Sequence, residues 1–207
     1  MSNLDEWQPK TRLGRMVKDG KITSIEEVFK LNQPIKEVEI VESLLPNLQE
    51  EVIDLNLVQR QTDAGEIGRF KATVVVGNGD GYIGFGEAKA KEVGPAIRLA
   101  IIKAKLNIRP VRRGCGSWEC GCGTSHSLLF KTTGRAGSVR ITLIPAPKGV
   151  GLVVADSIKL VLRLAGIKDV WCWSKGHTRT TFNFAKAAYD ALKNTYNIMT
   201  PKDWERA

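Results

Sequence analysis

A segment rich in arginine, glycine and cysteine, residues 109–126, separates two halves of the chain that have different hydrophobic patterns. In residues 51–91 apolar and polar side chains alternate with period two, and residues 95–106 then follow the period of a helix. The second half has short strand patterns between two helical ones. Since 207 residues are enough for two small domains, the pattern predicts two mixed α+β units joined by this linker.

The first unit is predicted to have the order βββα. Its strands are expected at residues 51–61, 70–76 and 82–91, followed by the helix. One face of that helix is apolar and consists of Ala96, Ile97, Ala100, Ile101 and Ala104. The glycines from Gly77 to Gly86 resemble a phosphate-binding loop, but such a loop leads from a strand into a helix. Here a second strand follows, so Asn78-Gly79 and Asp80-Gly81 favour a tight hairpin.

The second unit is predicted to have the order ββαβα. Two strands are expected at 127–133 and 138–144, around a turn at 134–137. A helix capped by Asp156 or Ser157 and ended by Gly166 should follow, and then a strand at 170–173. The last expected element is a helix from Thr180-Thr181 that buries Phe184, Ala188 and Leu192. Trp171 and Trp173 share one face of the third strand. We expect them to pack in the core; base stacking is the alternative and requires exposure.

The first 47 residues are polar and weakly patterned, with prolines and glycines at intervals. A short helix is expected from Ser24 to Leu31, because Ser24 and Glu27 have the spacing of a capping box. The remainder is interpreted as an extended arm that becomes ordered on a partner, since Trp7 and Phe29 need a surface to cover them. A flexible terminal segment without fixed structure is the alternative.

The basic residues are unevenly distributed along the chain. Residues 109–207 hold 16 of the 31 lysines and arginines but only 6 of the 22 acidic residues. Such an excess is typical of proteins that bind a polyanion, either nucleic acid or an anionic membrane. A membrane is less favoured because no apolar run approaches the roughly 20 residues needed to span one. The N-terminus has no apolar signal core, so we expect a cytoplasmic protein.

Three cysteines and a histidine in the linker have the spacing C-x4-C-x-C-x3-H. Cys115, Cys120, Cys122 and His126 are four soft ligands of the type that binds zinc in a tetrahedron. The glycines between them would let the backbone wrap around an ion. The residues therefore predict a structural zinc site, with free thiols as the alternative. A catalytic zinc is not expected, because no nearby His-x-Glu supplies an acid/base carboxylate.

The glycine loop that contains Lys148 and Gly151 resembles the phosphate loop of one superfamily of small-molecule kinases. Val153 and Val154 stand where that superfamily has paired serines, and valine has no hydroxyl for magnesium or phosphate. ATP chemistry is therefore the less favoured interpretation. The same loop, with Lys148 and open amides at a helix start, could instead hold an RNA phosphate.

Other basic side chains gather near turns and element ends. Lys89 and Lys91 are expected on one face of a strand. His177 is not expected to be a catalytic base, because no Ser, Cys or carboxylate completes a set. Lysines on helical faces, such as Lys186, are expected only to be solvated. The residues predicted to bind RNA are Lys10, Arg12, Arg15, Lys89, Lys91, Arg109, Arg112, Arg113, Arg135, Lys148, Lys175, His177 and Arg179.

Several motifs resemble the family of the fifth small-subunit ribosomal protein in its archaeal form. The resemblance runs from about Trp7 to Trp204, and its most specific stretches are Trp7–Gly14, Arg69–Gly77, Lys89–Ile97, Val111–Cys122 and Gly137–Pro147. The N-terminal extension and the cysteine cluster resemble the archaeal branch, because bacterial relatives lack both.

The resemblance implies a double-stranded-RNA-binding-like βββα domain followed by an α/β domain of the order ββαβα. The implied division is an extension that docks on partners (1–47), the RNA-binding domain (48–110), the cysteine-rich linker (111–126), the C-terminal domain (127–198) and a tail (199–207). No required cofactor is implied, and zinc remains an expectation from the residues alone.

The resemblance also implies a place at the junction of the body and head of the small subunit. There the protein would contact small-subunit rRNA, border the path by which messenger RNA enters, and influence decoding accuracy. Its expected neighbours are ribosomal proteins of the third, fourth and eighth small-subunit families. The rival hypotheses are a kinase relative that uses the Lys148–Gly151 loop and an RNA chaperone that acts outside the ribosome.

Overall fold

The computed structural model describes residues 7–198. Its N-terminal part consists of three short helices, α1 (Arg12–Lys18), α2 (Ile25–Lys30) and α3 (Val38–Leu44). The helix near Ser24 is confirmed, with Ser24 at the N-cap, although the Ser24 side chain makes no capping hydrogen bond. Glu27 instead accepts a hydrogen bond from the backbone N–H of Thr23.

The prediction of an extended arm is wrong. The three helices pack around a small core of Leu13, Ile22, Val28 and Ile40. Glu37 joins the ends of the segment by accepting hydrogen bonds from the Trp7 indole and from the backbone N–H groups of Lys10 and Thr11. These contacts connect positions about 26 to 30 residues apart, so helical periodicity within any one short helix does not reveal them.

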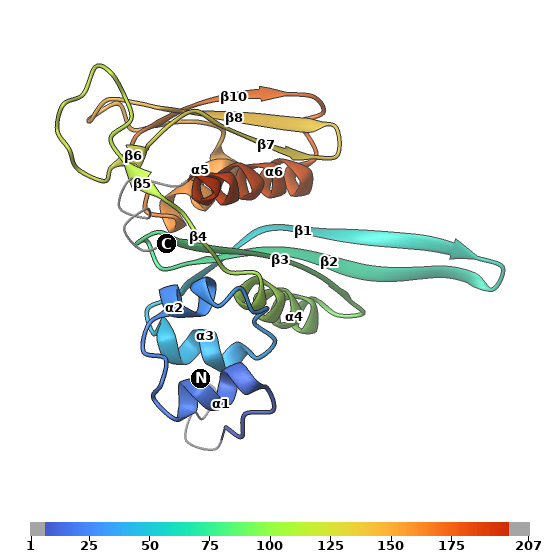
Figure 1. Ribbon diagram of the computed structural model, residues 1–207. Helices are drawn as coiled ribbons and strands as arrows, with labels where there is room; N and C mark the ends of the chain where they lie inside the picture. Colours follow the sequence, from blue (N-terminus) through green and yellow to red (C-terminus); the bar gives the residue numbers. More distant parts are fainter. Residues whose placement is uncertain (1–6, 199–207) are drawn as a thin grey trace.

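The first sheet has the strand order β1-β2-β3-β4. Its strands are β1 (Gln49–Thr62), β2 (Gly65–Gly77), β3 (Tyr82–Ala90) and β4 (Arg109–Pro110), all antiparallel to their neighbours. The β1–β2 hairpin is longer than predicted and projects as a two-stranded ribbon beyond the rest of the molecule (Figure 1). Gly79 and Gly81 have positive φ in the β2–β3 turn, as the hairpin interpretation requires.

Helix α4 (Val93–Leu106) covers one face of this sheet. Ala96, Ala100 and Ala104 are fully buried, which confirms the predicted apolar face. The helix approaches β3 closely, because a Cβ on Gly86 would lie 2.2 Å from the backbone oxygen of Ala100. The βββα order of the first unit is therefore confirmed.

The second sheet has the strand order β7-β8-β10-β9. Its strands are β7 (Thr132–Ala136), β8 (Val139–Pro145), β9 (Leu152–Val153) and β10 (Val170–Lys175), and its helices are α5 (Asp156–Leu164) and α6 (Thr181–Lys193), followed by the 3-10 turn η2 (Asn194–Asn197). The ββαβα order is confirmed, with the short strand β9 added. The N-cap of α5 is Ala155 rather than Asp156 or Ser157, and Gly166 has positive φ after this helix.

The predicted strand at 127–133 is divided in two. Its first residues form β6 (Ser127–Leu128), which pairs with β5 (Arg113–Gly114) in the linker, and its last residues begin β7. The hairpin turn lies at Gly137-Ser138, because residues 134–136 belong to β7. Gly134 is needed inside this strand, since a Cβ there would lie 2.2 Å from the backbone oxygen of Ala187 in α6.

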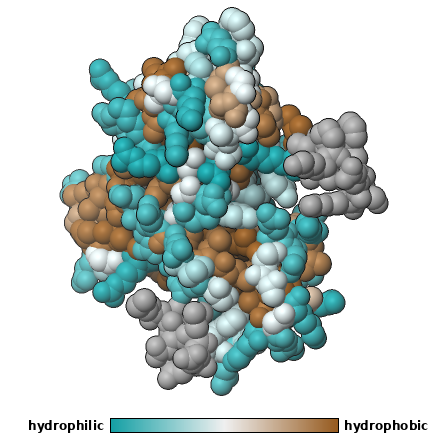
Figure 2. All heavy atoms as spheres, turned by 90° about the vertical axis from the view of Figure 1, so that its left-hand side faces the viewer, coloured by the Kyte–Doolittle hydropathy of each residue, from teal (hydrophilic) through white to brown (hydrophobic). Residues whose placement is uncertain are grey.

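The two units are stacked, with α5 and α6 between the two sheets (Figure 1). Phe85 of β3 contacts Phe182 and Tyr189 of α6, at ring-centroid distances of 5.9 and 5.8 Å. Residues of both sheets and both helices form one buried apolar cluster. On the side turned toward the viewer in Figure 2, hydrophobic patches alternate with hydrophilic side chains. Within residues 7–198, no helix has the length and apolar character to cross a membrane.

Candidate nucleic-acid interface and metal centre

The linker folds so that the four candidate ligands converge. The Sγ atoms of Cys115, Cys120 and Cys122 and a ring nitrogen of His126 all lie within 4.8 Å of one another. The Sγ atoms of Cys122 and Cys115 are 3.6 Å apart, and His126 Nε2 is 3.8 Å from Cys120 Sγ. In a tetrahedral zinc site, Zn–S bonds of about 2.3 Å separate two sulfur ligands by about 3.8 Å. The donor set and its spacing therefore fit zinc.

Asp169 holds the histidine of this cluster in place. His126 Nδ1 donates to the Asp169 carboxylate at 2.8 Å, and both side chains are buried. In the neutral ring this hydrogen bond favours the tautomer with the proton on Nδ1, in which the lone pair of Nε2 faces the thiols. A carboxylate that orients a histidine in this way is the usual outer partner of a zinc ligand.

Local hydrogen bonds change the pKa values of the cluster. Hydrogen bonds from the side chain and backbone of Thr124 lower the pKa of Cys122 to about 6. The backbone of Lys148 lowers the pKa of Cys120. Burial lowers the pKa of His126, but hydrogen bonds to Cys120 and Asp169 outweigh it and raise the pKa above the ordinary value. A lowered pKa shifts Cys122 and Cys120 toward the thiolate, which is the form that binds metals, whereas burial raises the pKa of Cys115.

The glycine loop before β9 is not an open phosphate cradle. The backbone N–H groups of Gly149 and Gly151 donate to the Asp169 carboxylate at 3.1 and 2.8 Å. Burial raises the pKa of Asp169, but these amides and His126 hold it below the ordinary value, so the carboxylate stays charged. An anion in the loop would have to displace this carboxylate. The expectation that open amides of this loop could hold an RNA phosphate is therefore wrong for Gly149 and Gly151, although Lys148 itself is exposed.

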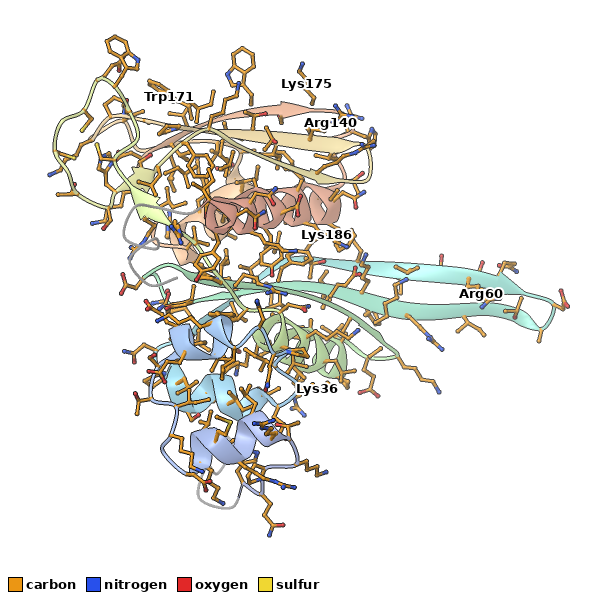
Figure 3. All side chains as sticks on the ribbon, in the orientation of Figure 1. Lys36, Arg60, Arg140, Trp171, Lys175 and Lys186 are labelled. Carbon is orange, nitrogen blue, oxygen red and sulfur yellow. The ribbon has the colours of Figure 1, made fainter. Side chains whose placement is uncertain are left out.

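Basic side chains do gather on the second sheet, on the face turned away from α6. A hollow of about 700 Å³ is lined by Lys131, Arg135, Arg140 and Lys175, together with Trp173. Trp171 and Lys175 lie on this outer side of the sheet, and Arg140 lies near the same end as Lys175 (Figure 3). Core packing was expected for both tryptophans, but Trp173 is 68% exposed. The physical reason is that α5 and α6 cover only the opposite face of the sheet.

A second basic hollow, of about 400 Å³, lies where α4, β3 and α6 meet. It is lined by Arg109, Lys103, Lys186 and Lys193, with Glu87 at its edge. Lys186 points from α6 into the space above the first sheet (Figure 3). The sequence suggested that Lys186 and Lys193 are only solvated, because their closeness to Arg109 appears only when the two units are stacked.

Arg113 is partly buried between the two units rather than exposed on a basic surface. Its guanidinium pairs with Asp80 in the β2–β3 turn and donates to the backbone oxygen of Gly166. Arg112 lies beside Tyr196, with 4.9 Å between its guanidinium carbon and the ring centroid. The neighbouring arginines thus face different surroundings, although the sequence groups them.

The remaining predicted residues lie at separate places. Lys10, Arg12 and Arg15 are exposed on the N-terminal unit, and Lys89 is exposed near the end of β3. Lys91 follows that strand instead of sharing its face. His177 and Arg179 are exposed in the β10–α6 loop, beside the β7–β8 turn, because Gly176 packs against Ser138. The predicted residues therefore form several basic regions rather than one surface.

The structure adds residues that the sequence analysis did not select for binding. These are Lys103, Lys131, Arg140, Lys186, Lys193 and Trp173 around the two hollows, and Asp169 behind the cysteine cluster. Arg140 and Trp173 could have been selected from alternation alone, since they occupy polar-facing positions of β8 and β10. No local signal identifies Asp169, which lies 43 residues from His126.

Two family models match the chain. One, described as ribosomal protein S5, N-terminal domain, matches residues 48–112, and the other, ribosomal protein S5, C-terminal domain, matches residues 134–206. The chain is 60% identical over 205 residues to "Small ribosomal subunit protein uS5" of Aeropyrum pernix, which covers 99% of this chain and 94% of that protein. It is 62% identical over 199 residues to the protein of the same name from Thermofilum pendens, covering 96% and 98%. With the Sulfurisphaera tokodaii protein of that name it shares 57% identity over 204 residues, covering 99% and 95%.

Proposed function

This chain belongs to the ribosomal protein S5 family, and from this premise we propose that it holds small-subunit rRNA through separate basic surfaces. It is a structural constituent of an archaeal-type small ribosomal subunit and acts in translation, in the cytoplasm where ribosomes work. The observation that carries the proposal is the near-complete alignment with proteins named as small-subunit constituents. The family is structural, and its members require no cofactor.

The mechanism is non-covalent. Lysine and arginine side chains contact phosphate oxygens, and the shape of the folded RNA decides which site is bound. The N-terminal unit with Arg12 and Arg15, the end of β3 with Lys89, and the two basic hollows are the proposed contact regions. The N-terminal helices, the first sheet and the second sheet, which carry these regions, lie at different levels of the stack (Figure 1), so the protein would join several RNA segments. The five-part division at residues 47, 110, 126 and 198 is retained as part of this proposal.

We further propose a place at the junction of the small-subunit body and head. There the protein would border the path by which messenger RNA enters and would support decoding accuracy. Proteins of the third, fourth and eighth small-subunit families would be its neighbours. These statements depend on the family resemblance, and the position of the protein in an assembled subunit tests them.

The rRNA proposal is tested by measuring how affinity for a small-subunit rRNA fragment depends on salt. Each lost phosphate contact should reduce the slope of log affinity against log salt by about one unit. Arg109→Gln and Lys186→Gln are expected to reduce it. Lys159→Gln is the matched control, because Lys159 pairs with Asp156 on an exposed face of α5. Equal slopes for all three variants would refute the contacts.

A kinase function predicts ATP turnover by the purified protein, which RNA binding alone does not. ATP turnover that survives high salt and is lost in Lys148→Gln would favour it over RNA binding. An RNA chaperone outside the ribosome would dissociate from small subunits in high salt, whereas a constituent should sediment with them.

We propose that Cys115, Cys120, Cys122 and His126 hold a structural zinc ion. The proposal is supported by the convergence of four ligand atoms and by the carboxylate behind His126. Zinc would supply cross-links between parts of the linker, which has little regular structure between β5 and β6. The ion would thereby fix the linker against the second unit through Asp169.

Elemental analysis of protein purified without chelator should give one zinc per chain. His126→Ala should reduce this amount, whereas Cys172→Ser should not, because Cys172 lies in β10 outside the cluster. Removal of zinc with a chelator should lower the melting temperature. Absence of metal in the unmodified protein would show that the cluster is only a group of thiols.

A further inference from the structure

The outer face of the second sheet carries three basic residues directly opposite one another. Arg140 of β8 pairs in register with Arg135 of β7 on one side and with Lys175 of β10 on the other. All three side chains are exposed. Like charges directly opposite on a sheet destabilise it, so this row is unfavourable unless an anion lies across it.

Within the described part of the chain, the charge of this row is only partly balanced. Among residues 7–198, the Arg140 and Lys175 side chains form no ion pair or hydrogen bond, and the Arg135 side chain donates only to the backbone oxygen of Gly137. Asp190 is the one acidic side chain of these residues that lines the hollow, and its carboxylate accepts the backbone N–H of Arg135 at 3.0 Å. Lys131, Arg135, Arg140 and Lys175 line the same hollow, so a net positive charge remains available to a ligand.

The next row of the same face carries an exposed indole. Trp173 pairs in register with Thr142, which pairs with Thr133. Residues of one face that are two positions apart on a strand are separated by about 6.8 Å, so Trp173 lies beside the cationic row. The hollow between them, about 700 Å³, is in the range of pockets that hold small organic groups, roughly 300 to 1,000 Å³.

An aromatic ring next to phosphate-binding cations fits an unpaired nucleotide. Bases in a duplex are stacked on one another and cannot reach a side chain on a flat sheet, whereas an unpaired base can stack on an indole. An acidic protein segment would satisfy the cations but would leave the indole without a planar partner. The observations therefore favour single-stranded RNA over both a duplex and an acidic peptide.

We propose that the outer face of β7, β8 and β10 binds an unpaired RNA segment, with one base stacked on Trp173 and its phosphates on Arg140 and Lys175. The inference rests on the proposed rRNA-binding function and specifies one site of it. Thr133 and Thr142 lie in the same row as the indole, next to the cationic row, and their hydroxyls can donate to the sugar or base.

The test uses the full chain and an unstructured RNA oligonucleotide of about ten nucleotides, within the site sizes of aromatic single-strand binders. Trp173→Ala should weaken its binding about tenfold or more, the usual effect of losing one base–aromatic stack. Trp173→Phe should restore part of the affinity. Trp118→Ala is the matched control, because Trp118 is 93% exposed but lies in the linker, and it should bind like the unmodified protein. Melting temperatures of all variants verify that they are folded.

Three outcomes would overturn the site. The first is that the Trp173→Ala and Trp118→Ala proteins bind the oligonucleotide with equal affinity. The second is that a blunt RNA duplex displaces the oligonucleotide as readily as a single strand does. The third is that poly-glutamate of matched charge displaces it. Failure here is distinct from failure of the proposed function. If the oligonucleotide result is negative but binding of the rRNA fragment keeps its salt slope, only this site is wrong. If the rRNA fragment also fails to bind, the proposed function is wrong.

Discussion

Arg113 connects three parts of the molecule through one guanidinium group. It extends from the linker, pairs with Asp80 in the β2–β3 turn and reaches the backbone oxygen of Gly166 after α5. The two turns also touch directly, since a Cβ on Gly166 would lie 2.2 Å from the backbone oxygen of Gly79. Arg113 therefore fixes the orientation of the second unit on the first.

Replacing Arg113 by Gln should lower the free energy of unfolding by about 1 to 2 kcal/mol. Hydrogen bonds to charged groups contribute about 1.5 to 3 kcal/mol, and the exposure of Asp80 reduces this value. Urea unfolding measures the change. Lys159→Gln, which loses only an exposed pair with Asp156, is the control and should change stability little. If Arg113→Gln lowers the affinity for RNA without lowering the free energy of unfolding, Arg113 contacts RNA and does not stabilise the fold.

Side-chain roles could be predicted where the partners are close in sequence. The cysteine cluster spans 12 residues, and its convergence followed from spacing and glycines alone. Arg113 has partners 33 and 53 residues away, and Asp169 is 43 residues from His126. Such pairs depend on how the two units stack. Neighbouring arginines therefore look equivalent in the sequence, although their side chains have different partners in the folded protein.

At the scale of elements, one partly buried lysine of α4 connects this helix to both α3 and β1. Lys105 Nζ lies 2.8 Å from the carboxylates of both Glu42 in α3 and Glu50 in β1. Its side chain is 13% exposed. Lys105→Met should destabilise the protein by about 1 to 2 kcal/mol. Lys103→Met, an exposed position on the same helix, is the control and should change stability little.

The effect of Lys105→Met should depend on pH in a definite direction. Burial lowers the pKa of Lys105, but hydrogen bonds to Glu42 and Glu50 outweigh it and raise the pKa above the ordinary lysine value. A raised pKa in the folded state means that the contribution is fully present below about pH 10.4 and is lost as the pH rises through the folded pKa. The stability difference between the two proteins should be constant from neutral pH to about 9 and shrink above the ordinary value. A difference that grew with alkaline pH would contradict this.

Helices and strands could be predicted where a periodic pattern of apolar residues extends over enough residues. Helix α4 and the strands β1 and β3 were found within a few residues of their ends, because alternation or a 14-residue stripe defines them, whereas β2 begins at Gly65, before its predicted start at Phe70. Helices α1 and α3 have seven residues each and were missed. Their stability comes from a core assembled from distant segments and from Glu37, not from periodicity within each helix.

The whole molecule depends on a core that both units share. Val75, Ile83 and Phe85 of the first sheet lie in the same buried cluster as the residues of α5, α6 and the second sheet. The N-terminal unit has its own cluster around Leu13 and Val28, and a smaller cluster joins its Ile25 and Val41 to Ile108 after α4. Two domains that share a large core should unfold together, while a unit joined to the rest by a few side chains can open first.

Phe85→Ala is the substitution that tests this coupling. Phe85 is 5% exposed and contacts rings of α6, so truncation should cost about 3 to 5 kcal/mol. If the core is shared, hydrogen exchange should show the same loss of protection in β2 and in β8, although the residue itself lies in the first unit. Val28→Ala is the counterpart in the N-terminal cluster, and it should increase exchange in α1 to α3 before either sheet is affected. Loss of protection confined to β1–β3 in Phe85→Ala would mean that the units unfold independently and that their stacking contributes little to stability.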